Sequence, residues 1–536
     1  MMKFERILAA AVLAVATIGF RAAHGGRGDD PGKPSREPVR EFRFPSTGSS
    51  VRGEAILLAI DNHLLPLKKN LCYYLCEPKV RKEPVIRPSR DNPKQPDHIA
   101  AHFYGTVLQD QGKFRMWYYA ISLGARPTDL RQGPICYAES DDGIRWRKPN
   151  LGQVEFRGSK DNNAIQLPDK STQCAAVIKD ESDPDRQRRY KMVYTAVHEK
   201  GVWWTFRTAT SPDGIRWTAR GDFPVPSFLE MGSFYRHDGL YVVHGQGAGH
   251  SEGGYAHGRR GYASVSPDFE RWNHGFVEAF SLAEPATTGD RGGNGPYNQV
   301  HVGVGAVSLG NVAVGLYGLW HNPAADKRNK NGWYGAGVIS CDFGLLISND
   351  GLHFREPVKG HVYLSNTESP APPLGGKNWP TILCQANGIL NVGDETRIYH
   401  GRWRNGPKLM CPDYYAEVAV ATLRRDRWGA LGLGPGKSEG SVWSAPVTLP
   451  DGGCRISLNA DHAQQVQVEV SDARFNLLPE YSGARSGCVR AEGGLECPVT
   501  WPAGNLSGLG GKTVRFRMYL KRKGDSGPRL YAAYLR

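Results

Sequence analysis

The feature of this sequence that most constrains its fold is a short turn motif that recurs five times. The first copy, Ser140–Trp146, reads Ser-Asp-Asp-Gly-Ile-Arg-Trp. The later copies are Ser211–Trp217, Ser266–Trp272, Ser348–Phe354 and a degenerate Thr422–Trp428, and the aromatic residue always falls six positions after the Ser or Thr. Successive aromatic residues are 55 to 82 positions apart, a spacing that indicates one supersecondary unit per copy.

The residues of the motif have the chemistry of a tight turn between two strands. A β-prone run leads into each copy, as in Ile135–Glu139 and Gly344–Ile347. The Asp side chain accepts hydrogen bonds from nearby backbone N–H groups, and Gly adopts a positive φ without strain. The aromatic residue then begins a returning strand and packs into the core. We therefore predict that each copy is the hairpin that joins the last two strands of a four-stranded sheet.

Two further strands precede each copy of the motif. Their predicted residues are 104–109 and 114–119, 174–178 and 190–194, 232–235 and 240–243, 302–306 and 312–316, and 387–390 and 396–399. Five four-stranded units arranged radially form an all-β, five-bladed β-propeller, which we assign to residues 51–436. We expect Glu54–Ile60 to add a strand to the fifth blade, because an open ring would leave exposed strand edges.

The ends of the chain have a different character. Lys3 and Arg6 precede an apolar run from Ile7 to Phe20, which is too short to span a bilayer, so residues 1–25 are predicted to be a signal peptide. An uncleaved membrane anchor is the alternative. Residues 26–50 are rich in Gly, Pro, Arg and Asp and are expected to form a flexible linker. The protein is therefore predicted to be secreted or periplasmic, with no membrane span after signal cleavage.

A second all-β domain is predicted at the C-terminus. Residues 429–436 are Gly-rich and mark its boundary. Within residues 437–536, the segments 455–459, 466–470, 514–519 and 530–534 alternate between apolar and polar side chains, as the strands of a β-sandwich do.

Charge and cysteine content exclude some functions. The net charge is +14, but it is spread along the chain without a basic stripe or a nucleic-acid-binding module, so no nucleic-acid partner is expected. An acidic glycan, an anionic envelope or a generally basic surface all remain compatible with this charge. The ten cysteines contain no CxxC pair, which disfavours a zinc ribbon, and export would permit disulfides. No cofactor and no metal site is predicted.

The architecture resembles glycoside hydrolase families 32 and 43, which join a five-bladed propeller to a β-sandwich. The phrases at 114–119, 137–143 and 353–357 are similar to exported bacterial proteins of the family-32-like group. The turn motif also resembles the Asp-box of sialidases. That box, however, has one more residue between Asp and the aromatic residue, and sialidases have six blades.

The resemblance implies a site on the propeller axis with three carboxylates from the first strands of blades one, two and three. Glu230 heads the blade-three strand in a context similar to family 43 and is the general-acid candidate. For blade one, Asp97 precedes the first strand, and Asp61 is the rival candidate. Blade two departs from the pattern, because its strand begins with Gln173 and Cys174 rather than Asp.

Other residues at the same end of the propeller are candidates for substrate binding. Polar side chains at the heads of first strands and aromatic or basic residues near the rim would satisfy sugar hydroxyls and stack on sugar rings: Gln173, His301, Gln385, Asn387, Trp320, His321, Arg402 and Trp403. The leading hypothesis is a secreted glycoside hydrolase that cleaves a polysaccharide or oligosaccharide. The alternatives are a non-catalytic glycan-binding propeller and, from the basic charge alone, a sialidase or sulfated-glycan enzyme.

Overall fold

The computed structural model describes most of the chain after residue 39. The described residues are 40–124, 130–169, 171–196, 205–221, 225–247, 260–273, 276–280, 282, 299–321, 339–373, 375–376, 378–404 and 414–536. The chain divides into two compact units, Met1–Val39 and Arg40–Arg536, so the predicted signal peptide and residues 26–39 of the predicted linker lie outside the described residues. The described part consists of strands and a few short 3-10 turns, which confirms the predicted all-β class. It contains no helix that is long and apolar enough to cross a membrane.

Three antiparallel units follow one another in the first half of the chain. The first comprises β7 (Ala100–Asp110), β8 (Lys113–Leu123) and β9 (Leu130–Ser140), and a bridge between Glu139 and Arg147 marks its fourth position. The second comprises β10 (Thr172–Lys179), β11 (Tyr190–Ala196), β12 (Thr205–Ser211) and β13 (Thr218–Ala219), with β14 (Val225–Phe228) also paired to β12. The third comprises β15 (Glu230–His237), β16 (Leu240–Gly247), β17 (Arg260–Ser266) and β18 (Val277–Phe280).

Two more units complete the series. The fourth comprises β19 (Gln299–Ser308), β20 (Ala313–His321) and β21 (Ser340–Ser348), with a bridge between Ile347 and Arg355 in its fourth position. The fifth comprises β23 (Ile389–Val392), β24 (Glu395–Arg404) and β25 (Tyr415–Arg424), and β22 (Ile382–Cys384) joins it to the fourth.

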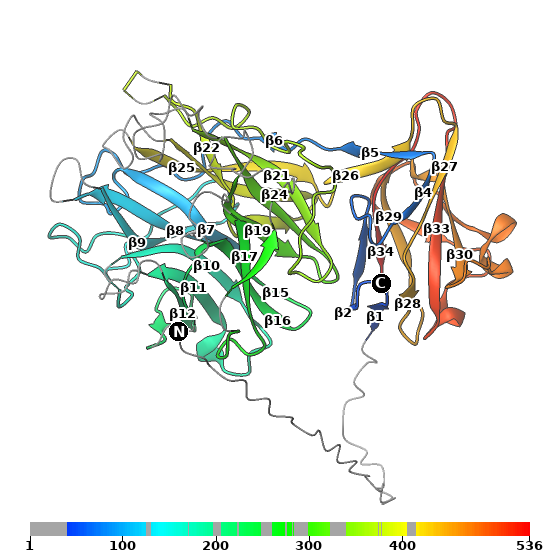
Figure 1. Cartoon of the computed structure of the whole chain (residues 1–536), viewed down its shortest axis with the longest axis horizontal. Helices are drawn as coiled ribbons and strands as arrows, with labels where there is room; N and C mark the ends of the chain where they lie inside the picture. The colour runs from blue at the N-terminus through cyan, green and yellow to red at the C-terminus, as the bar shows by residue number, and fades with distance from the viewer. Residues whose placement is uncertain are drawn as a thin grey trace, which may run out of the picture. The chain divides into compact units, whose positions relative to one another are not determined.

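The five units close into a ring. Their first strands are in contact in the order β7, β10, β15, β19, β23 and again β7. Figure 1 shows the units following one another through the colours from blue to yellow. This arrangement confirms the predicted five-bladed propeller.

The strand that closes the ring is not the one predicted. β6 (Lys79–Val80) takes the fourth position of blade five, where Val80 lies opposite Ala421 of β25. The predicted segment Glu54–Ile60 instead contains β3 (Ala55–Leu58), which pairs with β34 (Arg529–Leu535). All four residues of β3 are buried. Ile56 and Leu58 pack in one apolar cluster with side chains of blades four and five. The segment therefore covers the outside of these blades rather than extending one of them.

Four copies of the turn motif have the predicted hairpin geometry. In the first, Ser140 Oγ accepts a hydrogen bond from Gly143 N at 2.8 Å, and Asp142 Oδ1 accepts from Ile144 N and Arg145 N, each at 2.8 Å. The Asp oxygens accept the equivalent backbone hydrogen bonds in the copies that begin at Ser211, Ser266 and Ser348. Each of these copies follows the third strand of its blade.

The turns also connect neighbouring blades. Tyr399 OH of blade five donates to Gly143 O at 2.8 Å, and Trp117 Nε1 of blade one donates to Gly214 O at 2.9 Å. Tyr235 OH of blade three donates to Gly351 O at 2.5 Å. In each case a side chain of one blade bonds the central glycine carbonyl of the next blade's turn. The motif is therefore a structural element of the ring, as its sequence predicts.

The fifth copy of the motif differs from this prediction. After Thr422–Trp428 the chain leaves the propeller and enters β26 (Gly429–Leu433), which pairs with β5 (Leu71–Leu75) and β34. A hairpin is not needed here, because β6 already supplies the fourth strand of blade five. Trp428 still packs near Tyr363, with ring centroids 6.2 Å apart. The strand pairing moves the predicted boundary from residue 436 back to Gly429.

The remaining strands form one 14-stranded sheet, which we call the C-terminal sheet. It contains β3, β5, β26 and β34 together with β1 (Glu41–Phe44), β2 (Ser49–Arg52), β4 (Leu67–Lys69), β27 (Glu439–Trp443), β28 (Val447–Thr448), β29 (Ile456–Asp461), β30 (Val466–Asp472), β31 (Gly487–Val489), β32 (Gly494–Thr500) and β33 (Thr513–Lys521). The hydrogen-bonded order continues through β31 and β32, so the region predicted as a β-sandwich is one sheet that folds over its own apolar core.

One expectation about the start of this region is corrected. Residues 41–52, largely assigned to a flexible linker, form the β1–β2 hairpin, in which Phe42 and Phe44 are buried in the core of the C-terminal sheet. None of the nine described cysteines forms a disulfide, and Cys411 lies outside the described residues.

Candidate functional site

The first strands of four blades are distorted near their N-terminal ends. The pairing register shifts between His102 and Thr106 in β7, between Gln173 and Ala176 in β10, between Met231 and Ser233 in β15, and between His301 and Val304 in β19. Such bulges re-aim side chains and are common next to active sites. Cys174 and Val302 lie at two of these bulges with φ of 51° and 59°, a conformation that non-glycine residues rarely adopt.

Aromatic and imidazole rings gather at this end of the propeller. His102 stacks on Tyr119 with ring centroids 4.8 Å apart, and its centroid lies 4.5 Å from that of Tyr104. Tyr104 OH and His301 Nε2 are hydrogen-bonded at 3.2 Å, which joins blade one to blade four across the axis. We call the connected set of rings the axial cluster, and it comprises His102, Tyr104, Tyr119, His301, Trp320, Trp403 and Tyr414.

Glu230 lies at the head of β15 beside the axial cluster. Its carboxylate accepts a hydrogen bond from Gln246 Nε2 at 3.2 Å. Burial and then the charge of Glu230 raise the pKa of the Cys174 thiol, and the same charge contributes, after burial, to the raised pKa values of Tyr104 and Tyr119. Glu230 therefore lies close enough to these groups to act on them electrostatically.

Two glutamines support the bulged backbone. Gln246 bonds Glu230 with its amide nitrogen and accepts from Val302 N with its amide oxygen at 3.0 Å. Gln385 donates to the carbonyl oxygens of His301 and Gly303, the latter at 2.8 Å. Gln385 was predicted to bind substrate, but its amide nitrogen is used to hold the blade-four bulge. Gln173 is buried in β10, opposite Thr195 of β11.

His102 belongs to the axial cluster and is absent from the sequence prediction. Burial lowers its pKa to about 3, so its ring is neutral at physiological pH. A signal was present in the sequence: His102 and His301 each lie in a first strand, and each is followed within three residues by a glycine, Gly105 or Gly303. The shared pattern becomes visible when the first strands of the blades are aligned by their bulges.

Asp97 does not lie with Glu230. Its carboxylate accepts from Lys148 Nζ at 2.6 Å and from Tyr118 OH at 2.9 Å, and its side chain is fully buried. Tyr118 and Tyr119 are consecutive residues of β8 and point to opposite faces of the blade. Asp97 contacts the Tyr118 face, whereas the axial cluster contains Tyr119, so Asp97 lies in a buried ion pair apart from Glu230, and its catalytic role stays a prediction.

Asp61 is also part of a buried network elsewhere in the protein. It accepts from Arg355 at 2.5 Å and from Asn349 Nδ2 at 2.7 Å, both in or next to the fourth turn motif. It also accepts from the backbone N–H groups of His63 and Leu64. These contacts hold the segment after β3 against blade four, and the catalytic role of Asp61 stays a prediction.

The predicted substrate-binding residues also include two tryptophans and a histidine. Trp320 and Trp403 are buried within the axial cluster, and Trp403 Nε1 donates to Cys384 Sγ at 2.6 Å. His321 pairs with Asp342 at 2.6 Å, where burial would raise the pKa of Asp342 but hydrogen bonds from His321 and Asn366 hold it below its ordinary value.

Arg402 and Asn387 are used by the fold. Arg402 is buried and bonds Glu417, Ser369 Oγ and the carbonyl oxygens of Arg81 and Lys82. Asn387 bonds the backbones of three other blades, through Val107, Val177 and Phe234. Both were predicted to bind substrate, and the structure assigns their polar groups to inter-strand contacts instead.

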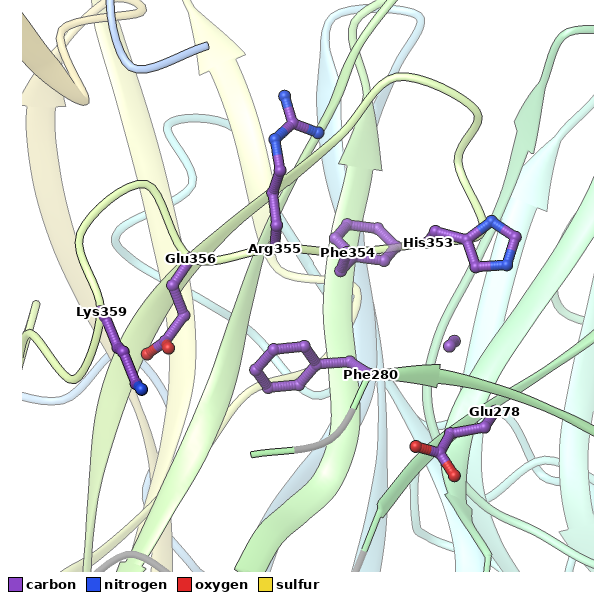
Figure 2. A pocket seen from close by; sticks show the side chains of 8 residues that line it. Glu278, Phe280, His353, Phe354, Arg355, Glu356 and Lys359 are labelled. Carbon is purple, nitrogen blue, oxygen red and sulfur yellow. The ribbon is translucent and has the colours of Figure 1, made fainter. Parts of the chain in front are cut away.

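A cavity of about 550 Å³ lies away from the axial cluster, on the outer strands of blades three and four. Figure 2 shows Phe280 and Phe354 in its middle, with Glu356 and Lys359 on one side and Arg355 pointing away. Its two carboxylates are engaged: Glu278 pairs with Arg260 at 2.9 Å, and Glu356 accepts from Tyr317 OH and Gly360 N. The axial cluster, with Glu230 beside it, is therefore the stronger candidate site.

Comparison with known proteins finds distant similarities, and no family model matches the chain. Two uncharacterized proteins of Mycobacterium tuberculosis, from strains CDC 1551 / Oshkosh and ATCC 25618 / H37Rv, are each 32% identical over 118 residues, which is 22% of this chain and 34% of each relative. The chain thus spans about a third of the length of the curated relatives it matches.

Similar solved structures are glycoside hydrolases and a phosphorylase. A β-1,2-mannobiose phosphorylase from Listeria innocua is 14% identical with a TM-score of 0.42, covering 66% of this chain and 97% of its own. A glycosyl hydrolase from Bacteroides ovatus is 16% identical with a TM-score of 0.41, covering 66% and 95%. A thermostable family-43 glycoside hydrolase is 13% identical with a TM-score of 0.35, covering 60% and 88%.

Proposed function

We propose that the protein is an exported carbohydrate-active enzyme that binds a glycan at the axial cluster and cleaves a glycosidic bond with Glu230 as the general acid. The observation that carries this proposal is the position of the Glu230 carboxylate beside buried aromatic rings, at the end of the propeller where four first strands are bulged.

The chemistry of the cluster suits a sugar. Aromatic faces stack on the apolar faces of sugar rings, and the imidazole, phenol and amide groups beside them hydrogen-bond hydroxyl groups. Cleavage of a glycosidic bond requires a water molecule that attacks the sugar carbon from the opposite face and an acid that protonates the leaving oxygen. Glu230 supplies that group, and Gln246 holds its carboxylate in place.

A second function, non-catalytic glycan binding, is favoured by one specific observation. Standard glycoside hydrolysis uses two carboxylates on opposite sides of the scissile bond. Asp97 and Asp61 are engaged by Lys148 and Arg355 away from the axis, and in the described ranges the contacts bring Glu230 alone of the three predicted carboxylates to the axial cluster. A lectin-like propeller would need the rings but not the acid.

The variant Glu230→Gln separates these functions. The wild-type protein is first tested on a panel of neutral and acidic glycans for release of reducing sugar and for binding. If Glu230 is the general acid, the Gln variant loses about 100-fold or more of turnover while its dissociation constant stays within a few-fold. Glu278→Gln, which removes a carboxylate from the outer cavity, is the matched control and keeps full turnover.

Other results decide against cleavage. Binding without reducing-sugar release, together with loss of binding on His102→Ala, supports the lectin-like function instead. Absence of both binding and cleavage across the panel contradicts both functions. Export is tested separately: N-terminal sequencing of the protein recovered outside the cytoplasm should begin near residue 26, and recovery of the intact N-terminus would contradict the predicted signal peptide.

A further inference from the structure

One face of the C-terminal sheet carries an unusual row of exposed rings and guanidinium groups. In β33, Val514, Phe516, Met518 and Leu520 are buried in the core of the sheet, so the alternate residues Arg515, Arg517 and Tyr519 point outward. Trp443 of β27 lies opposite Arg517 on one side and opposite Leu67 of β4 on the other.

The outward side chains touch in sequence along this face. The Arg517 guanidinium lies 5.6 Å from the Tyr519 ring centroid and 5.4 Å from that of Trp443. Trp443 packs edge-on against Phe475 at 5.3 Å, and the Arg515 guanidinium lies 4.2 Å over the Phe475 ring. We call this row, Tyr519, Arg517, Trp443, Phe475 and Arg515, the aromatic ladder.

The ladder lies in the most apolar exposed part of the described surface. Of the five large apolar side chains that are exposed in the described ranges, Leu67 (49%), Phe475 (41%) and Leu477 (40%) belong to this face. Single exposed apolar residues are ordinary, but a contiguous group of them marks a binding surface. Flat rings beside donors suit a ligand that has apolar faces and polar edges.

The charge of the face indicates the kind of ligand. Four outward cations, Lys69, Arg515, Arg517 and Lys521, accompany two carboxylates, Glu439 and Glu469. Glu439 already accepts from Tyr519 OH, and Glu469 pairs with Arg517 at 3.2 Å. Arg515 donates to the carbonyl oxygens of Ala473 and Ser444, each at 3.0 Å, and has no carboxylate partner within the part of the chain that the structure describes.

We propose that the aromatic ladder is a second carbohydrate-binding site, separate from the axial cluster, that takes an anionic glycan. The sugar rings stack on Tyr519, Trp443 and Phe475, and carboxylate or sulfate groups of the chain bind Arg515 and Lys521. Guanidinium groups bind such oxyanions with charge-assisted, often bidentate hydrogen bonds. This site does not depend on Glu230, so it stands whether or not the propeller cleaves its ligand.

The test measures binding of the full chain to three purified glycans at low ionic strength, where surface charges are least screened. Polygalacturonate presents carboxylates, chondroitin sulfate presents sulfates as well, and galactomannan is neutral. We expect binding of at least one anionic glycan at least ten-fold tighter than of galactomannan, and weaker binding as salt is added. The two anionic polymers together show which group the ladder accepts.

Two variants locate the binding at the ladder. Arg515→Gln removes the cation without a carboxylate partner, and Phe475→Asn removes an exposed ring. Phe475 has φ of 68°, a conformation that Asn tolerates well. Each variant should weaken anionic-glycan binding about ten-fold or more. Arg455→Gln, an exposed arginine of the same sheet next to β29, removes the same charge elsewhere and should leave binding within two-fold.

Several outcomes would overturn the proposal. These are equal binding of galactomannan, no binding of either anionic glycan, or unchanged binding by both ladder variants. Arg515 is half-buried, so circular dichroism is used to check that the Arg515→Gln variant is folded. If Arg515→Gln unfolds, the binding measured with Phe475→Asn decides the test. A concentration-dependent dimer that disappears in Phe475→Asn would show instead that the face binds a second copy. His102→Ala, which removes a ring of the axial cluster, should bind the anionic glycan as the wild type does, which separates this site from the axial one.

Discussion

The side-chain oxygen of Asn387 accepts a hydrogen bond from the backbone N–H of Phe234 at 3.0 Å, although 153 residues separate them in the chain. The side-chain amide of Asn387 donates to the carbonyl oxygens of Phe234 at 2.8 Å and Val177 at 3.3 Å. The backbone carbonyl oxygen of Asn387 accepts from Val107 N at 3.0 Å. One residue of blade five therefore bonds the first strands of blades one, two and three. Its side chain joins blades two and three, and its backbone joins blade one.

Replacing Asn387 should destabilise the whole propeller. Asn387→Ala removes three side-chain hydrogen bonds and leaves backbone groups of β10 and β15 without these partners, so we expect the free energy of unfolding to fall by about 2–4 kcal/mol. Urea denaturation followed by tryptophan fluorescence measures the change. Gln187→Ala, which removes an exposed amide side chain, is the control and should change stability by less than about 0.5 kcal/mol. Equal stabilities of the two variants would contradict the role given to Asn387.

The buried pair of Asp61 and Arg355 should contribute to stability and not to turnover. Arg355→Gln leaves a fully buried carboxylate without its guanidinium, which should cost about 3–5 kcal/mol. Asp61→Asn removes both the charge and the need for a partner, so its cost should be smaller. Thermal unfolding measures both variants. A folded Asp61→Asn protein that has lost its turnover would restore the catalytic role that the sequence predicts.

Lys148 and Asp97 allow a parallel test in blade one. Lys148 Nζ bonds Asp97, Ser89 Oγ and the carbonyl oxygen of Arg87. Lys148→Met should therefore loosen the segment before β7, and it leaves the buried Asp97 carboxylate without its cation. We expect a loss of about 3–5 kcal/mol for Lys148→Met and a smaller loss for Asp97→Asn. Limited proteolysis should then cut near residues 87–97 faster than in the wild type. An unchanged digestion pattern would show that the contacts of Lys148 do not hold residues 87–97 in place.

Buried histidines should make the protein sensitive to mild acid. Burial lowers the pKa of His102 to about 3, of His244 to about 4 and of His400 to about 3, the last with a further contribution from Arg402. The unfolded chain binds protons at these histidines below about pH 6.5, whereas the folded chain does not. Stability therefore falls as pH decreases, by about 2 kcal/mol per histidine between pH 7 and pH 5.

Denaturation at several pH values checks this expectation. His102→Gln removes one of these groups and should make the decrease in the free energy of unfolding between pH 7 and pH 5 about 2 kcal/mol smaller. Stability that is constant from pH 7 to pH 5 would mean that these rings are protonated in the folded protein.

Local chemistry explains which parts of the fold the sequence predicts. The turn motif is recognisable because Ser, Asp and Gly bond their own neighbouring backbone, so five copies reveal five blades. Long-range pairing has no such local signal. The apolar run Ala55–Leu58 would suit any buried sheet edge, and nothing in those residues distinguishes β34 from blade five as the partner.

The candidate site shows the same division. Glu230 and His301 could be found because they head strands that the motif already locates. Asp97 and Asp61 look like catalytic carboxylates in sequence, since their partners Lys148 and Arg355 are 51 and 294 residues away. The sequence does not predict a place for His102 in the site, because a bulge changes the direction of a side chain without changing the residue pattern.

The origin of the C-terminal sheet has a consequence for how the chain is made. Its strands come from both ends of the unit, β1 to β5 before the propeller and β26 to β34 after it. The propeller is thus an insertion within another folded body. During synthesis, β3 emerges early and must remain without its partner until β34 leaves the ribosome. A truncated product that lacks β34 would retain a closed propeller but leave Ala55 and Leu57 of β3, which pack in the core of the C-terminal sheet, uncovered, and such a surface is prone to aggregation.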